Sequence, residues 1–143
     1  MELPEYGTEA GRYMVPIMFY KPDGSLKRTE DGTMQQIDIM PTILGMLDYD
    51  LPYIAFGNDL TRVSPERSFA VGCNNGVFQF FKDGYLLQFD GEEPIGLYDY
   101  VSDKMLQENL VDSVDCSGNL ELLKSVIQQY MERMTDHDAL RVN

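Results

Sequence analysis

The side chains that could bind a metal ion through imidazole are few. The chain has a single histidine, His137, in the dipeptide Asp136-His137. A protein metal site needs several ligands brought together by the fold, and no second histidine is present to join this one. We therefore interpret His137 as a solvated residue at the end of a helix, and we predict no metal ligand in this chain.

The residues that could attack a substrate or bind a phosphate also lack a motif. Two cysteines, Cys73 and Cys116, are too few for a disulfide framework, and the sequence leaves open whether they form one bridge. Cys73 closes an apolar run, where burial is ordinary, and Cys116 lies in a polar stretch. Gly7 and Gly11 are too isolated to form a phosphate-binding loop. We predict no catalytic and no cofactor-binding residue.

Paired carboxylates could serve acid–base chemistry, and two such pairs occur, Glu92-Glu93 and Asp48 with Asp50. Both pairs lie in turn-like segments, where acidic residues are ordinary solvated turn formers. We therefore assign neither pair a catalytic role.

Asp38 differs because it stands between two isoleucines, just ahead of a helix that Pro41 is well placed to start. A carboxylate at this position satisfies free N–H groups at the helix start, and this is the interpretation we favour. Gln35 and Gln36 could face a cleft in a larger protein, but nothing in the sequence requires it.

The composition is that of a globular and strongly acidic protein. Of 143 residues, 43% are hydrophobic, and 24 acidic against 11 basic residues give a net charge of -13. Such a surface repels nucleic acids and anionic membranes. No apolar run reaches the roughly 18 residues of a membrane span, and Met1–Gly7 lacks the pattern of a signal peptide. We expect no nucleic-acid partner, no direct membrane contact and no targeting signal in this chain.

The first 62 residues predict one strand and one short helix. Residues 13–20 are apolar almost throughout, which favours a strand buried on both faces, with Pro16 near its beginning or at the sheet edge. The apolar residues at helical spacing after Gln36 predict a short helix with one apolar face. They are Met40, Ile43, Leu44 and Leu47.

Residues 63–143 predict a small antiparallel sheet and a helix. The strand-like runs are 68–73, 77–82, 85–89 and 95–98, and Asn75-Gly76 and Asp83-Gly84 favour tight hairpins. Apolar residues at helical spacing predict a helix over about 119–134, whose apolar face needs the sheet as its partner. The fold class is therefore α+β, a four-stranded antiparallel meander packed on a C-terminal helix.

The order of four short motifs resembles a known family. The run Asp38-Ile39-Met40-Pro41-Thr42-Ile43-Leu44 is followed by Phe56-Gly57-Asn58-Asp59-Leu60. Upstream is Val15-Pro16 within an apolar run, and downstream is Leu97-Tyr98-Asp99. This arrangement resembles the C-terminal part of sulfatases and of lipoteichoic-acid-synthase-like phosphoglycerol transferases, in the alkaline phosphatase superfamily. The resemblance implies that residues 1–62 are the edge of an incomplete α/β catalytic domain, and 63–143 a small subdomain.

The family's catalytic groups are not matched in this chain. Its enzymes attack phosphate or sulfate esters with a metal-activated nucleophile. In the family, an Asp-His pair of metal ligands lies just before the segment with which this chain begins. Met1–Gly7 contains no such pair. The sulfatase pattern C/S-x-P-x-R is approached by Ser64-Pro65-Glu66-Arg67, but its proline and arginine come too early. The transferases' threonine lies far upstream and does not correspond to any threonine here, which are Thr8, Thr29, Thr33, Thr42, Thr61 and Thr135.

The resemblance therefore implies a structural piece of a longer, extracytoplasmic, membrane-anchored or exported enzyme. The divalent metal would belong to that intact parent, and the main partner would be the rest of its catalytic domain. We also expect dimerisation or strand exchange through residues 13–20, because an unpaired apolar strand recruits a partner.

Two alternatives remain at this stage. The chain could be a self-standing binding module that uses the aromatic residues of the sheet as a ligand platform: Phe78, Phe80, Phe81, Tyr85 and Phe89. It could also be a small acidic enzyme whose site follows no known motif. Burial of the aromatic residues in the core is the simpler expectation.

Overall fold

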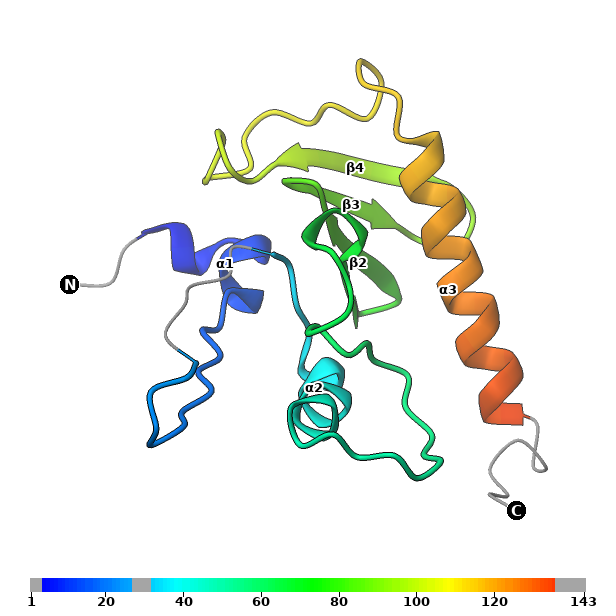
Figure 1. The fold of residues 1–143 in the computed structure, drawn as a ribbon. Coiled ribbons are helices and arrows are strands. Elements are labelled where there is room, and N and C mark those ends of the chain that lie inside the picture. Colours follow the sequence, from blue (N-terminus) through cyan, green and yellow to red (C-terminus); the bar gives the residue numbers. More distant parts are fainter. Residues whose placement is uncertain (1–3, 27–31, 136–143) are drawn as a thin grey trace.

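The protein is an α+β fold built on one four-stranded antiparallel sheet (Figure 1). A computed structural model describes residues 4–26 and 32–135. The strands are β1 (Ala70–Asn74), β2 (Val77–Lys82), β3 (Tyr85–Phe89) and β4 (Pro94–Asp99), and they lie side by side in sequence order. The predicted meander is confirmed. The interpretation of Asp136-His137 concerns residues outside these ranges.

Two tight hairpins set the register of the sheet. Asn75 and Gly76 join β1 to β2 with φ of 51° and 82°, and Asp83 and Gly84 join β2 to β3 with φ of 53° and 82°. Positive φ at both central residues is the type I′ geometry, which matches the twist of antiparallel strands and favours Asn-Gly and Asp-Gly. The local sequence therefore encodes both turns.

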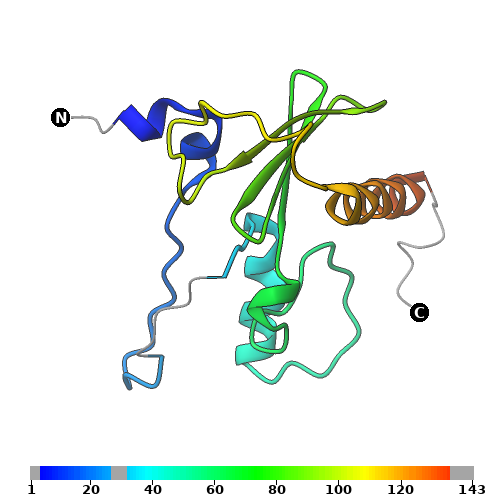
Figure 2. The same cartoon turned by 90° about the horizontal axis from the view of Figure 1, so that it is seen from above.

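The helix α3 (Ser117–Thr135) covers one face of the sheet (Figures 1 and 2). Leu123 of this helix is fully buried among alternate residues of the strands. Burying a leucine stabilises a fold by about 2 kcal/mol. The buried core at this face consists of Phe80, Leu87, Phe89, Leu97 and Leu123. This confirms the prediction that the sheet is the partner of the helix.

The opposite face of the sheet is covered by the N-terminal segment. A 3-10 turn, η1 (Pro4–Gly7), leads into α1 (Glu9–Tyr13), and both come in addition to the one strand and one short helix predicted for residues 1–62. Thr8 explains the difference, because its hydroxyl oxygen accepts a hydrogen bond from the backbone N–H of Gly11 at 3.1 Å and caps the helix. Ala10 then packs against Phe81 and Leu86 of the sheet.

The predicted short helix is confirmed and begins slightly earlier than expected. A 3-10 turn, η2 (Gln36–Asp38), runs into α2 (Ile39–Met46), so that Pro41 is the third helical residue. The missing N–H of proline costs nothing there, because the first four N–H groups of a helix have no intrahelical acceptor. A further 3-10 turn, η3, spans Pro65–Arg67. No helix in the described ranges is both long and apolar enough to cross a bilayer.

The strand expected over residues 13–20 is not formed. Tyr13 ends α1, and residues 14–20 have no regular secondary structure. A strand needs a neighbouring strand to pair with, and the sheet of the described residues does not extend to this segment. Met18 and Tyr20 consequently lie in the open, with 88% and 83% of their surface exposed.

Candidate functional site

The best-organised polar cluster in the N-terminal half is centred on Asp38. Its side chain is only 1% exposed. One carboxylate oxygen accepts a hydrogen bond from the backbone N–H of Gln35 at 2.9 Å, and the other from the backbone N–H of Asn58 at 2.8 Å. Burial raises the pKa of this carboxyl, although both N–H groups act in the opposite direction. The expectation that Asp38 satisfies free N–H groups at the start of the Pro41 helix is wrong for α2, to which its side chain makes no capping bond. Its bond to the backbone N–H of Gln35 instead closes a capping box at the start of η2.

Thr42 makes a second link between the same two segments. Its hydroxyl donates to the backbone carbonyl of Asn58 at 3.3 Å and accepts from the backbone N–H of Leu60 at 3.1 Å. Thr42 is 2% exposed, so these bonds are shielded from water. Asp38 and Thr42 therefore fix the loop 57–60 against the first turns of α2.

Two glycines permit this close approach. A Cβ atom at Gly45 would overlap the carboxylate of Asp59, and one at Gly57 would overlap the backbone carbonyl of Ile37. The glycines, the aspartates and the threonine of the two motifs thus contact one another. Their arrangement is explained by packing and backbone hydrogen bonds, and both carboxylate oxygens of Asp38 already accept backbone N–H groups.

Further contacts join this cluster to the sheet and to α3. The side-chain oxygen of Gln35 accepts a hydrogen bond from the backbone N–H of Val71 at 3.1 Å. Gln35 thus pairs with the outer edge of β1. Arg133 of α3 donates to the backbone carbonyl of Ala55 at 3.2 Å and lies 5.7 Å from the ring centre of Phe56. Gln35 therefore contacts the sheet, and no substrate cleft is needed to explain it.

The other carboxylates singled out in the sequence are not brought together. Glu92 and Glu93 are exposed in the β3–β4 turn, where their backbone N–H groups donate to Asp90. Asp48 and Asp50 are exposed after α2. In residues 4–26 and 32–135, no group of three or more His, Cys, Asp and Glu side chains could hold a metal ion.

Both cysteines in the structure are free thiols, so the bridge that the sequence left open is not formed. Cys73 is exposed, which differs from the burial we expected. The reason is its position near the end of the edge strand β1, in register with Phe78 and next to the turn. Cys116 is half-buried just before α3.

Three of the five residues of the proposed aromatic platform are buried, and Phe78 and Tyr85 are half-buried against the core beneath α3. Phe80 and Phe89 are buried beneath α3, whereas Phe81 is on the opposite face and packs against Tyr13 at 5.4 Å between ring centres. The aromatic residues therefore form core on both faces of the sheet, as the simpler expectation held.

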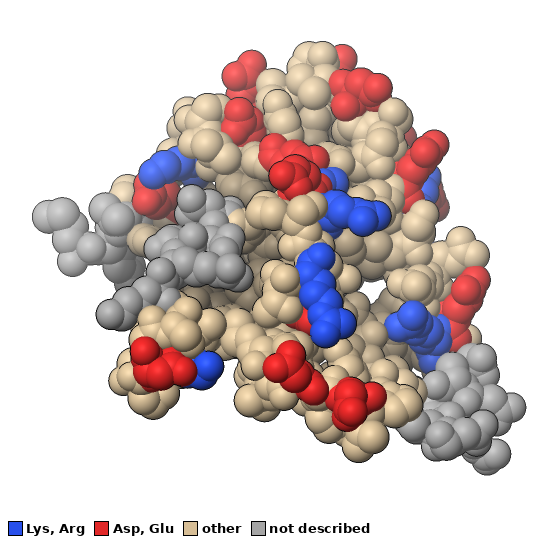
Figure 3. Space-filling view, in the orientation of Figure 1, with Lys and Arg blue, Asp and Glu red and all other residues tan. Residues whose placement is uncertain are grey.

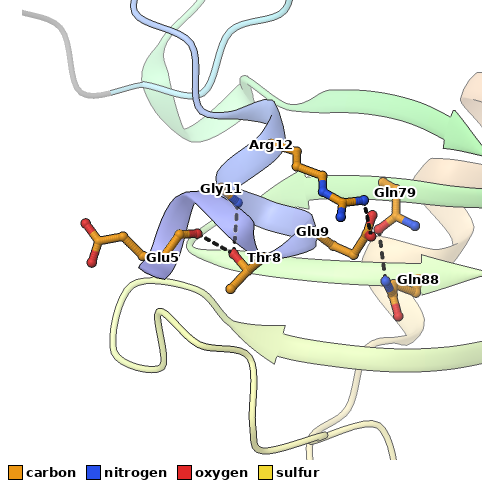
Figure 4. A network of polar contacts seen from close by, with 7 residues as sticks. All are labelled: Glu5, Thr8, Glu9, Gly11, Arg12, Gln79 and Gln88. Atoms are coloured by element: carbon orange, nitrogen blue, oxygen red, sulfur yellow. Dashed lines mark hydrogen bonds and ion pairs between the residues drawn. The ribbon is translucent and has the colours of Figure 1, made fainter. Parts of the chain in front are cut away.

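A shallow hollow beside α1 was not foreseen from the sequence. It has a volume of about 440 Å³ and lies between the N-terminal turns and the loop after β4. The nearby polar contacts are all between protein groups (Figure 4): Thr8 caps α1, Arg12 pairs with Glu9 at 3.0 Å, and Gln88 donates to Gln79 at 3.1 Å. At the hollow itself, Lys104 lies 3.8 Å from the carboxylate of Glu5. These contacts join groups of the protein to one another and stabilise the fold.

Comparisons with family models, with curated proteins and with solved structures gave no match.

Proposed function

We propose that this chain is a C-terminal structural piece of a metal-dependent sulfuric-ester hydrolase or phosphoglycerol transferase. In this proposal the nucleophile and the metal ligands are supplied by other parts of the enzyme. The order of the motifs at residues 15–16, 38–44, 56–60 and 97–99 supports the family. The tight packing of the two central motifs supports a structural role for this segment.

One observation carries the structural role. Helix α2 contains no charged side chain, and yet Met40, Ile43 and Leu47 around it are 47%, 40% and 71% exposed. A helix that is apolar all round belongs inside a larger protein, and eight residues are too few to cross a bilayer. A covering domain accounts for this surface, and the rest of a catalytic domain is the cover that the resemblance suggests.

Residues 14–20 support the same role. They are uncharged, largely exposed and outside the sheet, so that they can pair with a strand of a larger domain. When no such domain is present, a second copy can offer its own segment instead, and we expect dimers through residues 13–20. In Figures 1 and 2 this segment and α2 both extend away from the sheet.

The described residues contain no group of side chains that could bind the metal of the proposed enzyme. Both carboxylate oxygens of Asp38 already accept backbone hydrogen bonds, and the remaining carboxylates do not converge. The proposal therefore assigns this chain no catalytic step. Its location outside the cytoplasm is inferred from the resemblance alone.

An activity assay tests the proposal. The purified chain is incubated with an aryl sulfate, and separately with a phosphoglycerol lipid, in the presence of Mg²⁺, Mn²⁺, Ca²⁺ or Zn²⁺. We expect product formation no faster than in the enzyme-free blank, because the described residues bring no set of side chains together that could bind the metal. Metal-dependent turnover above the blank contradicts a purely structural role.

A further inference from the structure

We propose that the outer face of α2 and the loop after it bind an apolar surface of the covering domain of the proposed enzyme, and that this surface carries a basic side chain. This docking face consists of Met40, Ile43, Leu47, Asp48, Asp50 and Leu51. Leu47 and Leu51 are 71% and 60% exposed at its centre. The inference rests on the proposed structural role and specifies the chemistry of the partner.

The electrostatics of the helix end call for a cation. Asp48 follows α2 with φ of 52°, and the backbone N–H of Tyr49 bonds to the carbonyl of Leu44 at 3.0 Å, which is a Schellman end. The C-terminal end of a helix carries partial negative charge, and basic side chains are favourable there. The last turn of α2 has none, and Asp48 and Asp50 add two further negative charges.

Residues 35–61 contain four aspartates and no lysine or arginine. Among the described residues, the basic side chain next in sequence, Arg62, is already paired with Asp59 at 3.2 Å. In the orientation of Figure 3, acidic atoms lie at the bottom of the molecule, where Figure 1 places α2 and its exit loop, and basic atoms lie directly above them. A second copy meeting this face with its own docking face would bring only acidic side chains together. The charge therefore favours a basic surface of the covering domain over a second copy of this chain.

A designed peptide tests this face. The probe is a fluorescein-labelled helical peptide of about 15 residues, with leucines on one face and lysines on the other. The control peptide replaces every lysine by glutamate. We expect fluorescence anisotropy to show binding of the Leu/Lys peptide alone. Leu47→Asp should weaken that binding about tenfold, because a charge replaces a central apolar contact. Circular dichroism should show an unchanged fold, since Leu47 is exposed.

A matched pair of charge variants separates the docking face from general attraction to an acidic protein. D48N/D50N and E92Q/E93Q each remove two negative charges, the first pair at the docking face and the second in the distant β3–β4 turn. We expect the first to weaken peptide binding about threefold or more, in keeping with two exposed ion pairs, and the second to change it much less.

Equal effects of the two double variants, binding of the Leu/Glu peptide, or no binding at all would each overturn the inference. So would a dimer, seen by sedimentation, that Leu47→Asp dissociates, because a second copy would then occupy the face. None of these binding results depends on turnover. A negative binding result can therefore be told apart from a positive activity assay, which would contradict the proposed function.

Discussion

The carboxylate of Asp38 accepts a hydrogen bond from the backbone N–H of Asn58 at 2.8 Å, although the two residues are 20 positions apart in the chain. The bond is shielded from water, because Asp38 is only 1% exposed. It ties the start of a short helix to the loop that returns past it. The two most distinctive motifs of the sequence are therefore one structural unit.

Removing the Asp38 carboxylate should destabilise the protein. In Asp38→Ala the backbone N–H groups of Gln35 and Asn58 lose their acceptor, and an unsatisfied buried donor costs about 1–3 kcal/mol. The cost of burying the ionised carboxylate offsets part of this, so that we expect a net loss of about 2 kcal/mol in the free energy of unfolding. Urea denaturation measures it. The exposed Asp50→Asn is the control, and an equally small effect of both variants would contradict the structural assignment.

The glycines of the same unit should tolerate no side chain. Gly57→Ala places a methyl group against the backbone carbonyl of Ile37, which cannot move without displacing η2. We expect a loss of about 2 kcal/mol, within the range for overpacking. Gly118→Ala is the matched control, because Gly118 lies in α3 with nothing near its added methyl. There the change should raise stability by up to about 1 kcal/mol. Thermal unfolding of the two variants should move in opposite directions.

The sequence predicts the sheet better than it predicts the contacts of Asp38. Asn75-Gly76 and Asp83-Gly84 specify their turns locally, and the apolar stripe that includes Leu123 specifies a helix that needs an apolar partner. Asp38 could be recognised as a helix-start residue, since its bond to Gln35 is local. Its bond to Asn58 depends on how the loop returns, which no local pattern reveals.

For residues 13–20 the sequence predicts a strand that the structure does not form. Their apolar character is real, but a strand exists only beside another strand, and the described chain offers none in reach. The sequence analysis also missed Thr8 as a helix cap. A threonine followed by Glu9 and Ala10, two good helix formers, is a usable signal for a helix start. The contacts of a residue were therefore predictable where its partner is near in sequence. They were not predictable where the presence of a partner depends on the tertiary structure.

Asn109 should protect the outer edge of the sheet. Its side-chain oxygen accepts a hydrogen bond from the backbone N–H of Leu97 at 3.0 Å, and its side-chain nitrogen donates to the carbonyl of Ile95 at 3.1 Å. The side-chain amide of Asn109 therefore pairs with β4 as the backbone of a neighbouring strand would. In Asn109→Ala we expect the Leu97 amide to exchange with solvent at least tenfold faster, which corresponds to a loss of about 1.4 kcal/mol. Hydrogen-exchange NMR measures it. An unchanged rate at Leu97 would show that the edge is protected by other means.

The acid stability of the protein should reflect two opposing groups of carboxyls. Hydrogen bonds from Ser25 lower the pKa of Asp23 to about 2, and backbone N–H groups of Glu93 and Glu92 lower the pKa of Asp90. For a lowered pKa, the unfolded chain binds protons first as the pH falls. The Asp23 carboxylate therefore stabilises the fold above pH about 4 and loses that contribution between pH about 4 and about 2. The Asp90 carboxylate likewise loses its contribution as the pH falls.

Asp38 acts in the opposite sense. Its pKa is raised by burial, so that the folded protein binds the proton first and this residue contributes more stability as the pH falls through its folded pKa. The turn carboxyls outnumber it, and we expect the free energy of unfolding to decrease on acidification from pH 6 to pH 3. In Asp38→Asn the opposing contribution is gone, and the decrease should be steeper. In Asp90→Asn it should be shallower, because one stabilising carboxylate no longer titrates. Urea denaturation across this pH range distinguishes the two slopes, and an identical slope in Asp38→Asn and the unmodified protein would mean that Asp38 titrates normally despite its burial.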